Sequence, residues 1–389
     1  MKHLIKQEQS EPARSAEREN GGMKFKIGIL TYHRAENYGA LLQAYALLTY
    51  LKSLGHRVSF VDYWPAYHSD YFKIFSWTNF VSRPIKSKLH ILVRLLLMGS
   101  KLYSRKKVMQ KFMHERLGLS ENPRYTDRNG STEKYDAVVY GSDQIWRKQN
   151  LGGVGFDEWY FGAGNVCADR RIVYAGSMGK LETSPEDVSF VKAQMRNFSS
   201  IAVRENDLHD YLQQQGVPSD VVIDPVFLLN REQWHQLAVA PKSDSKYILF
   251  YNLLNTPEST SFAKALSKET GLPIREITKK TSLKQKGSRL IDNASIEEFL
   301  GLVEHADYVV SNSFHGVAFS LVFERQFFAV GMGAKSNRVV SLLETAGISE
   351  RYIETMPHQI PLSPIDYDQV QIRIQKETDK SKDYLCKAL

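Results

Sequence analysis

The sequence is poor in cysteine, with only Cys167 and Cys386 among its 389 residues. These two lie far apart and fit no metal-ligand spacing, so a zinc site or a disulfide framework is not expected, and a reducing compartment is favoured. No run of 18 or more apolar residues occurs, which argues against a transmembrane helix. Residues 1–22 also lack the apolar core of a signal peptide, and we predict a disordered leader before a fold that starts at Met23.

Acidic residues are absent between Arg83 and Lys111, a segment that holds nine lysines and arginines. The other 42 Lys and Arg are matched by 43 Asp and Glu, so the net charge of +8 comes from this one segment. Such a local patch differs from the extended basic field of a nucleic-acid-binding protein, and no nucleic-acid partner is expected.

The same segment carries an apolar stripe at helical spacing, formed by Leu89, Leu92, Val93, Leu96 and Leu97. One interpretation is a helix that lies on an anionic membrane surface, with basic residues flanking its apolar face. A second is a helix whose leucines enter the core and whose lysines face solvent. Binding of an anionic glycan by the basic residues is a third.

The remaining composition is that of an ordinary globular protein, and the length suggests two domains. Strand-like runs lie at 24–32, 57–63, 135–143, 171–179, 199–205 and 220–225, and a second series lies at 246–254, 272–278, 307–313 and 326–332. Helical patterns lie at 38–55, 257–270, 295–306 and from about 315 onward. The alternation predicts an α/β protein with two Rossmann-like domains facing a cleft.

We expect the domains to span residues 23–230 and 231–355, with a helical, basic insertion at 66–130 and a tail or helix at 356–389. Ligands of open α/β sheets bind at the carboxyl ends of the strands, and every polar motif below lies at such an end.

Two polar loops belong to the first domain. "TYHRAENYGA" (31–40) places His33, Arg34, Asn37 and Gly39 after the first strand, where they either bind a ligand or form a capping turn with Asn37 as N-cap. This loop is not G-x-G-x-x-G, so a dinucleotide site has little support.

The second of these loops, "GSDQIW" (141–146), contains Ser142, Asp143 and Trp146. Asp143 is either a catalytic base or a helix cap, and Trp146 either contacts a ligand or belongs to the core.

Two further motifs suggest an anion site. "VREN" places Arg204 at a strand end, where a guanidinium forms a surface ion pair or clamps a phosphate or carboxylate. "SNSFHG" places Ser311 and Ser313 at a strand end and His315 and Gly316 at the start of a helix, whose first N–H groups favour an anion. The alternative is that the serines are caps and the histidine is a satisfied core residue.

Taken in order, "TYHRAENYGALLQAYAL", "YGSDQIW", "AVREN", "VIDPVFLL" and "SNSFHGVAFSLVFERQFFAVG" resemble the polysaccharide pyruvyl transferase family over most of residues 24–350. The resemblance implies a GT-B-like fold and transfer of pyruvate from phosphoenolpyruvate to a sugar as a ketal, with release of phosphate. It implies an acceptor that is a cell-surface polysaccharide, such as an exopolysaccharide or capsule, or its lipid-linked precursor. It also implies a cytoplasmic enzyme, peripheral to the inner face of the membrane if the basic segment binds lipid, with no metal and no cofactor other than this co-substrate.

The resemblance also assigns residues. Arg204 and His315 match the family's donor-binding arginine and histidine, and His315 would act as the acid that protonates the enol. Asp143 is a second catalytic candidate from its place after a strand alone, not from the resemblance. Many members read Arg-x-His where this chain has Ser313 in place of the arginine, and Lys335 or Arg338 would supply that charge.

Ser311, Ser313 and Gly316 complete the expected donor site in the second domain. The expected acceptor site in the first domain comprises His33, Arg34, Asn37, Gly39, Ser142 and Trp146. The alternatives to this function are a GT-B glycosyltransferase that uses a nucleotide sugar and a non-catalytic glycan-binding protein of the same fold.

Overall fold

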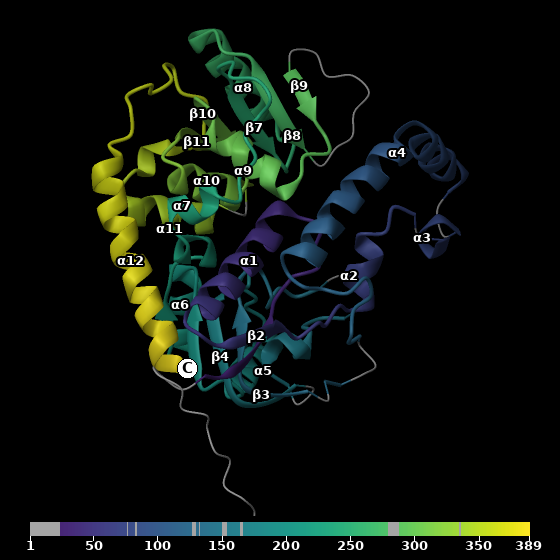
Figure 1. The fold of residues 1–389 in the computed structure, drawn as a ribbon, viewed down its shortest axis with the longest axis vertical. Coiled ribbons are helices and arrows are strands. Elements are labelled where there is room, and N and C mark those ends of the chain that lie inside the picture. Colours follow the sequence, from purple (N-terminus) through teal and green to yellow (C-terminus); the bar gives the residue numbers. More distant parts are fainter. Residues whose placement is uncertain are drawn as a thin grey trace, which may run out of the picture.

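The computed structural model describes residues 24–75, 77–81, 84–126, 130–131, 133–149, 154–163, 166–278, 288–333 and 336–389. The expected leader at 1–22 and Lys335 lie outside the described residues. Each half of the chain forms one six-stranded parallel sheet covered by helices, as the alternating pattern predicted (Figure 1).

The first sheet has the strand order β2-β1-β3-β4-β5-β6. Its strands are β1 (Lys26–Leu30), β2 (Arg57–Phe60), β3 (Lys134–Gly141), β4 (Cys167–Gly176), β5 (Ser200–Val203) and β6 (Asp220–Val221). Its helices are α1 (Tyr38–Ser53), α2 (Ala66–Tyr71), α3 (Trp77–Val81), α4 (Ile85–Glu115), α5 (Pro185–Met195) and α6 (Asn206–Gln214), with a short 3₁₀ turn η2 (Glu158–Phe161). The central strands are apolar and buried, as expected where helices cover both faces.

The second sheet has the order β12-β11-β10-β7-β8-β9. Its strands are β7 (Ile248–Asn252), β8 (Ile274–Thr278), β9 (Ser288–Ile291), β10 (Tyr308–Ser311), β11 (Gln326–Val330) and β12 (Tyr352–Ile353). Its helices are α8 (Pro257–Thr270), α9 (Ile296–Glu304), α10 (Phe314–Val322) and α11 (Asn337–Ala346), with the 3₁₀ turn η5 (Ser349–Arg351) before β12. The connection between the two sheets contains η3 (Pro225–Leu228) and α7 (Arg231–His235).

The C-terminal helix α12 (Tyr367–Ala388) leaves the second domain and returns along the first (Figure 1). Near its end, the Ser381 hydroxyl accepts a hydrogen bond from the Ile223 N–H at 2.9 Å. The Tyr384 hydroxyl donates to the Val173 carbonyl at 2.8 Å. The helix therefore connects the two domains a second time, independently of the 226–245 segment.

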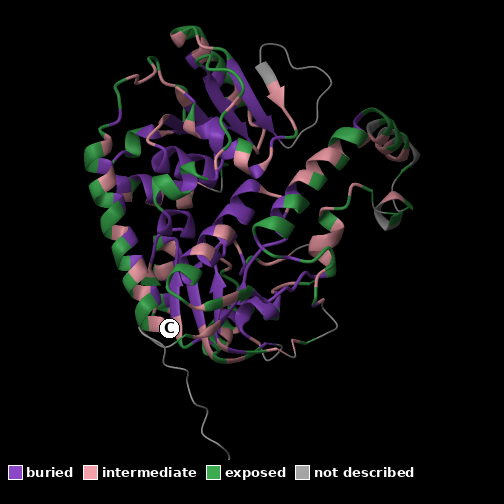
Figure 2. Ribbon diagram, viewed as in Figure 1, coloured by how far each residue is buried: buried purple, intermediate pink, exposed green. Residues whose placement is uncertain are grey.

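An apolar interface joins the domains near α1. The Tyr38 ring stacks on Phe299 of α9 with 4.6 Å between ring centroids, and its hydroxyl donates to the Ala294 carbonyl at 2.7 Å. One hydrophobic cluster includes buried residues of both domains. Figure 2 shows this continuous buried interior, from which α3 and the first half of α4 stand apart as mostly exposed or intermediate residues.

Candidate active site

Segments that are far apart in the sequence meet where the two domains touch. The ends of β3 and β5 contribute Ser142 and Arg204, and the residue before η3 is Asp224. From the second domain come His315 in the first turn of α10 and Arg338 in the first turn of α11. We call Ser142, Arg204, Glu205, Asp224, His315 and Arg338 the interdomain polar cluster. All lie at carboxyl ends of strands or starts of helices, where open α/β sheets bind their ligands.

The centre of the cluster is an ion pair between Arg204 Nη1 and Asp224 Oδ2. The Ser142 hydroxyl also donates to Asp224 Oδ2, at 3.1 Å. Burial raises the pKa of the Asp224 carboxyl, but the positive charge of Arg204, the electrostatic effect of His315 and the hydrogen bonds from the Val226 N–H and Arg204 together outweigh burial, and the net pKa lies below the ordinary value. Asp224 is thus an ionised carboxylate in a site closed to solvent.

Glu205 sits between the two arginines of the cluster. Its Oε1 lies 3.7 Å from Arg204 Nε and 3.9 Å from Arg338 Nε, and it accepts a hydrogen bond from the Ser177 hydroxyl at 2.5 Å. Both guanidinium groups also lie over the Phe314 ring, at 4.8 and 5.7 Å from its centroid. Burial raises the pKa of Glu205, although Arg204 and Arg338 oppose this shift.

Several buried polar atoms of the cluster lack a hydrogen-bond partner within the described part of the chain. They are Arg204 Nε and Nη2, Glu205 Oε2 and His315 Nε2. Leaving a buried donor unpaired costs about 1–3 kcal/mol, and more for a charged group. The unused N–H groups of Arg204 are therefore well suited to bind an anion that enters the cluster.

His315 lies at the contact between the domains. A Cβ added to Gly39 would be 2.0 Å from its Nδ1, so the imidazole occupies space that only a glycine leaves open. Its Nε2 is 3.9 Å from Asp224 Oδ2. Burial lowers the pKa of His315 to about 4, with Arg204 and Arg338 acting in the same direction and Asp224 and Asp143 opposing them. The imidazole is neutral at pH 7 in this state.

The loop after β3 has unusual backbone geometry. Ser142 and Asp143 have φ angles of 27° and 70°, and Ala175 on the neighbouring strand has 53°. Positive φ is uncommon for residues other than glycine, and such strain concentrates at functional sites. Asp143 is half-buried and caps its own loop by accepting from the Gln144 N–H at 2.9 Å. It is close enough to influence the pKa of His315.

Three residues predicted to bind the acceptor have other roles. His33 is buried with its ring nitrogens near the Thr31 carbonyl at 2.8 Å and Asp62 Oδ1 at 3.2 Å. Arg34 forms a two-point ion pair with Asp62, at 2.6 and 2.7 Å, and also donates to the carbonyls of Ser120 and Asn122. His33 therefore contacts only Thr31 and Asp62 among these groups, whereas Arg34 joins Asp62 to the 120–122 loop.

Trp146 is the third residue that was predicted to bind the acceptor and has another role. Its indole is fully buried, and its N–H donates to the Tyr160 carbonyl at 2.9 Å, so it belongs to the core and offers no surface to a ligand.

The glycines and the helix-capping residues of the predicted site contact neighbouring residues of the chain. Asn37 is the N-cap of α1, as predicted, and accepts from the N–H groups of Gly39 and Ala40. Gly316 permits a close approach by the Ser311 hydroxyl, which would lie 2.1 Å from an added Cβ. Ser311 accepts from the Ser313 N–H at 3.0 Å, and Ser313 is the N-cap residue of α10. Ser311 and Gly316 thus shape the turn that presents His315.

Asp224 and Glu205 were not identified from the sequence. Each carries a signal that could have been used, because Asp224 follows a strand and precedes Pro225, and Glu205 adjoins Arg204 in "VREN". Their partners lie on other segments, and only the fold brings them together.

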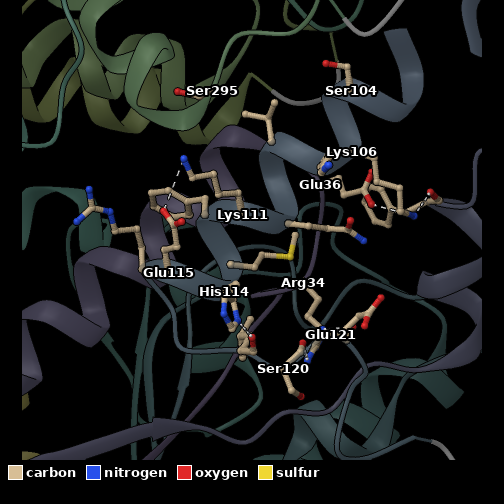
Figure 3. Close-up of a pocket in the computed structure, with 18 of the residues that line it drawn as sticks. Arg34, Glu36, Ser104, Lys106, Lys111, His114, Glu115, Ser120, Glu121 and Ser295 are labelled. Carbon is tan, nitrogen blue, oxygen red and sulfur yellow. Dashed lines mark hydrogen bonds and ion pairs between the residues drawn. The ribbon is translucent and has the colours of Figure 1, made fainter. Parts of the chain in front are cut away.

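Two cavities bear on the site, and only the smaller one is lined by residues of the interdomain polar cluster. The one beside Arg204, Phe314 and Arg338 has a volume of only about 40 Å³, so the cluster is closed in this state. A larger cavity of about 1260 Å³ lies between the second half of α4 and the start of α9. Figure 3 shows Arg34, Glu36, Lys106 and Lys111 around it, with Ser295 of the second domain opposite. This is the cleft between the domains, and its lining carries both signs of charge.

The described residues include no group of three or more His, Cys, Asp or Glu that could hold a metal ion.

Fold and site together define a two-domain, Rossmann-like α/β protein with a largely buried site between its domains that contains two arginines. The sequence matches the family described as polysaccharide pyruvyl transferase over residues 37–333, and the chain belongs to this family. A search of curated proteins finds no match.

Solved structures with similar folds are distant. The UDP-GlcNAc 2-epimerase from Neisseria meningitidis bound to UDP-GlcNAc is 9% identical, with 93% of each chain covered and a TM-score of 0.42. The S. aureus MnaA-UDP co-structure is 13% identical, with 93% of this chain and 90% of that chain covered and a TM-score of 0.42. The glycosyltransferase SnogD from Streptomyces nogalater is 11% identical, with 94% and 99% covered and a TM-score of 0.39.

Proposed function

We propose that this protein transfers pyruvate from phosphoenolpyruvate to a sugar of a cell-surface polysaccharide or its lipid-linked precursor, forming a ketal and releasing phosphate. The observation that carries the proposal is the pair of arginines beside His315, the buried Arg204 and the partly buried Arg338, in a chain of the polysaccharide pyruvyl transferase family. Among the described residues, Arg204 Nε and Nη2 have no hydrogen-bond partner, and these N–H groups would bind the donor's phosphate or carboxylate. Arg338 would supply the positive charge that Ser313 lacks.

The reaction requires that a proton reach the methylene carbon of the enol. Carbon 2 then becomes electrophilic, two sugar hydroxyls add to it, and the bond to the phosphate oxygen breaks. One of the two hydroxyl protons restores the acid that gave its proton to carbon. The other leaves with phosphate. The proposed proton donor is His315, which is neutral in the closed, unliganded state. A bound donor with several negative charges stabilises the imidazolium, so His315 would gain its proton on donor binding and then act as the acid.

The proposal also requires the interdomain polar cluster to open. A 40 Å³ cavity cannot hold phosphoenolpyruvate, so the donor must enter when the domains separate near His315 and Gly39. Closure then excludes water from the reacting atoms, which strengthens the electrostatic interactions inside.

The direct test incubates the protein with phosphoenolpyruvate and candidate free or lipid-linked oligosaccharides. We expect phosphate release that depends on the acceptor, together with the mass gain of a ketal. UDP- and CMP-sugars serve as alternative donors, and transfer of a sugar from one of them would contradict the proposal.

The His315→Ala variant should lose at least about 100-fold in turnover, because a positioned acid typically contributes this much or more. His235→Ala, on an exposed histidine of α7, is the matched control and should keep normal turnover. Near-normal turnover in His315→Ala would assign this residue to packing alone.

A further inference from the structure

The longest helix of the described chain, α4, has two halves with opposite surroundings. Its second half buries Met109, Phe112 and Met113 in the core of the first domain. Its first half stands away from the body beside α3 (Figure 1). There Leu89, Leu92, Val93, Leu96 and Leu97 are between 44% and 86% exposed, so the interpretation that places them in the core is wrong.

These five side chains form one continuous stripe, because their spacing repeats every three or four residues along a helix. On α3, Trp77 and Val81 are also exposed, and the two helices are joined by Lys88, whose ammonium lies 5.8 Å from the centre of the Phe80 ring. We call the exposed apolar side chains of α3 and of the first half of α4 the docking surface. Large exposed apolar patches mark interaction sites, whereas single exposed leucines do not.

We propose that the docking surface binds the anionic surface of a lipid bilayer, with α4 lying in the interface. Charge identifies this occupant, because four of the nine basic residues of this segment, Arg83, Lys86, Lys88 and Arg94, lie in the first half of α4 or just before it, and no acid accompanies them. Each basic residue near an anionic bilayer contributes about 1 kcal/mol of attraction, and an apolar face penetrates about 5–10 Å into the headgroup region.

An exposed tryptophan fits the same occupant. Trp77 of α3 is about two-thirds exposed, and tryptophan favours the boundary between lipid and water. Among the described helices, none is long and apolar enough to cross a membrane, and an amphipathic helix that lies on the surface does not need to be.

A second copy of this chain fits the docking surface less well. Symmetric pairing would place the same basic flank of both copies face to face, which costs energy through like-charge repulsion. The contact would also need acidic partners, and this segment provides none.

The orientation of α4 has a consequence that rests on the proposed function. The helix runs from the docking surface directly into the wall of the 1260 Å³ cavity, to which it contributes Lys107 and Lys111. From Leu97 to Lys107 the helix rises about 15 Å, at 1.5 Å per residue. A docked enzyme would thus hold its cleft within reach of the first sugars of a glycan carried on a membrane lipid.

The test is co-sedimentation of the full chain with vesicles of phosphatidylglycerol and phosphatidylcholine, against vesicles of phosphatidylcholine alone. We expect binding to the anionic vesicles that weakens at high salt, because the Debye length falls from about 10 Å at 0.1 M to about 3 Å at 1 M. Leu96→Glu should lower the partition coefficient roughly tenfold or more, since it replaces a fully inserted leucine by a charge. Ile372→Glu changes an apolar residue of α12 that is also exposed, 65% against 86% for Leu96, and should bind as the wild type does.

Neither variant changes a buried residue, so both should fold, which circular dichroism can verify. Absence of binding to anionic vesicles would overturn the proposal whatever the enzyme's activity. A concentration-dependent dimer that Leu96→Glu disrupts, without vesicle binding, would assign the surface to a second copy. If the protein binds anionic vesicles but forms no phosphoenolpyruvate-dependent product, the proposed function is wrong. The proposal that the docking surface binds a bilayer is then still supported.

Discussion

At the scale of single residues, the interdomain polar cluster depends on charges that compensate one another away from water. Arg204 and Asp224 are both buried, and neither would be stable there without the other. Removing one partner of such a pair commonly costs about 3–5 kcal/mol, because the other charge is left uncompensated. This cost is separate from any loss of donor binding, and the two effects can be measured apart.

We therefore predict that Arg204→Ala lowers the unfolding midpoint strongly and that adding Asp224→Asn recovers most of the loss. Asparagine keeps the side-chain oxygen that accepts the Val226 N–H, so the start of η3 stays capped. Chemical denaturation of the wild type, both single variants and the double variant measures the coupling. If the double variant is no more stable than Arg204→Ala, the loss reflects packing rather than charge. Donor binding should be weak in both variants that lack Arg204.

His315 makes stability depend on pH, with a sign that follows from its burial. Its pKa is about 4 in the folded protein against an ordinary value of 6.5, so the unfolded chain takes up the proton first as the pH falls. Its contribution to stability is fully present above about pH 6.5 and is lost progressively down to about pH 4. Between pH 7.5 and 5 the loss is about 2 kcal/mol.

The His315→Gln variant should lack this loss. We expect the wild type to lose about 2 kcal/mol more than the variant when denaturation is compared at pH 7.5 and 5. The other ten histidines of the chain are the same in both proteins and cancel in the difference. Equal losses in the two proteins would mean that His315 is protonated in the folded state at pH 5.

Sequence patterns identified Arg204 and His315 of the interdomain polar cluster but not its acidic residues, Asp224 and Glu205. Arg204 and His315 stand out because each follows a strand and carries a group suited to an anion. His33 and Arg34 carry the same signal, yet they pair with Asp62, which lies 29 and 28 residues away, respectively. That pairing depends on β2 lying beside β1 with Ile29 opposite Phe60, a register that the sequence does not reveal.

At the scale of helices and strands, the sequence predicts most of the fold. All ten predicted strands are present, because buried parallel strands read as short apolar runs between helical patterns. The strands that were not predicted, β9 and β12, have four and two residues and lie at the edges of the second sheet. Runs this short carry too little periodicity to identify. The helical character of 66–130 was predicted, but the direction in which α4 leaves the body was not.

Helix α1 bears directly on the site, because its second residue is Gly39. We predict that Gly39→Ala displaces His315 and lowers turnover nearly as much as His315→Ala, since the new Cβ would lie 2.0 Å from Nδ1 and 2.4 Å from Cγ of the imidazole. The matched control is Gly99→Ala in α4, where nothing lies within 4 Å of the added Cβ. It should leave turnover unchanged and stabilise the helix by about 0.5–1 kcal/mol. Normal turnover in Gly39→Ala would show that the contact between α1 and His315 opens in the active state.

At the scale of the whole molecule, two connections hold the domains together while the site must open. The 226–245 segment and α12 both cross between the domains, and the apolar contact of Tyr38 with Phe299 joins them near the cluster. A donor that binds residues of both domains therefore favours their closed arrangement. The free energy of donor binding adds to the free energy of unfolding of the whole molecule. The melting temperature therefore shows which donor the protein binds.

We predict that phosphoenolpyruvate raises the melting temperature and that UDP- and CMP-sugars do not. At 100 times its dissociation constant, a ligand that binds only the folded state stabilises it by about 2.7 kcal/mol, which corresponds to a shift of a few degrees. His315→Ala should keep the shift, because its proposed role is proton transfer, and Arg204→Ala should lose it, because its proposed role is to bind the anion. Inorganic phosphate should give a smaller shift than phosphoenolpyruvate, since it lacks the carboxylate. A shift with a nucleotide sugar and none with phosphoenolpyruvate would assign the cluster to a diphosphate, and a shift with glycan alone would indicate a binding protein without a donor.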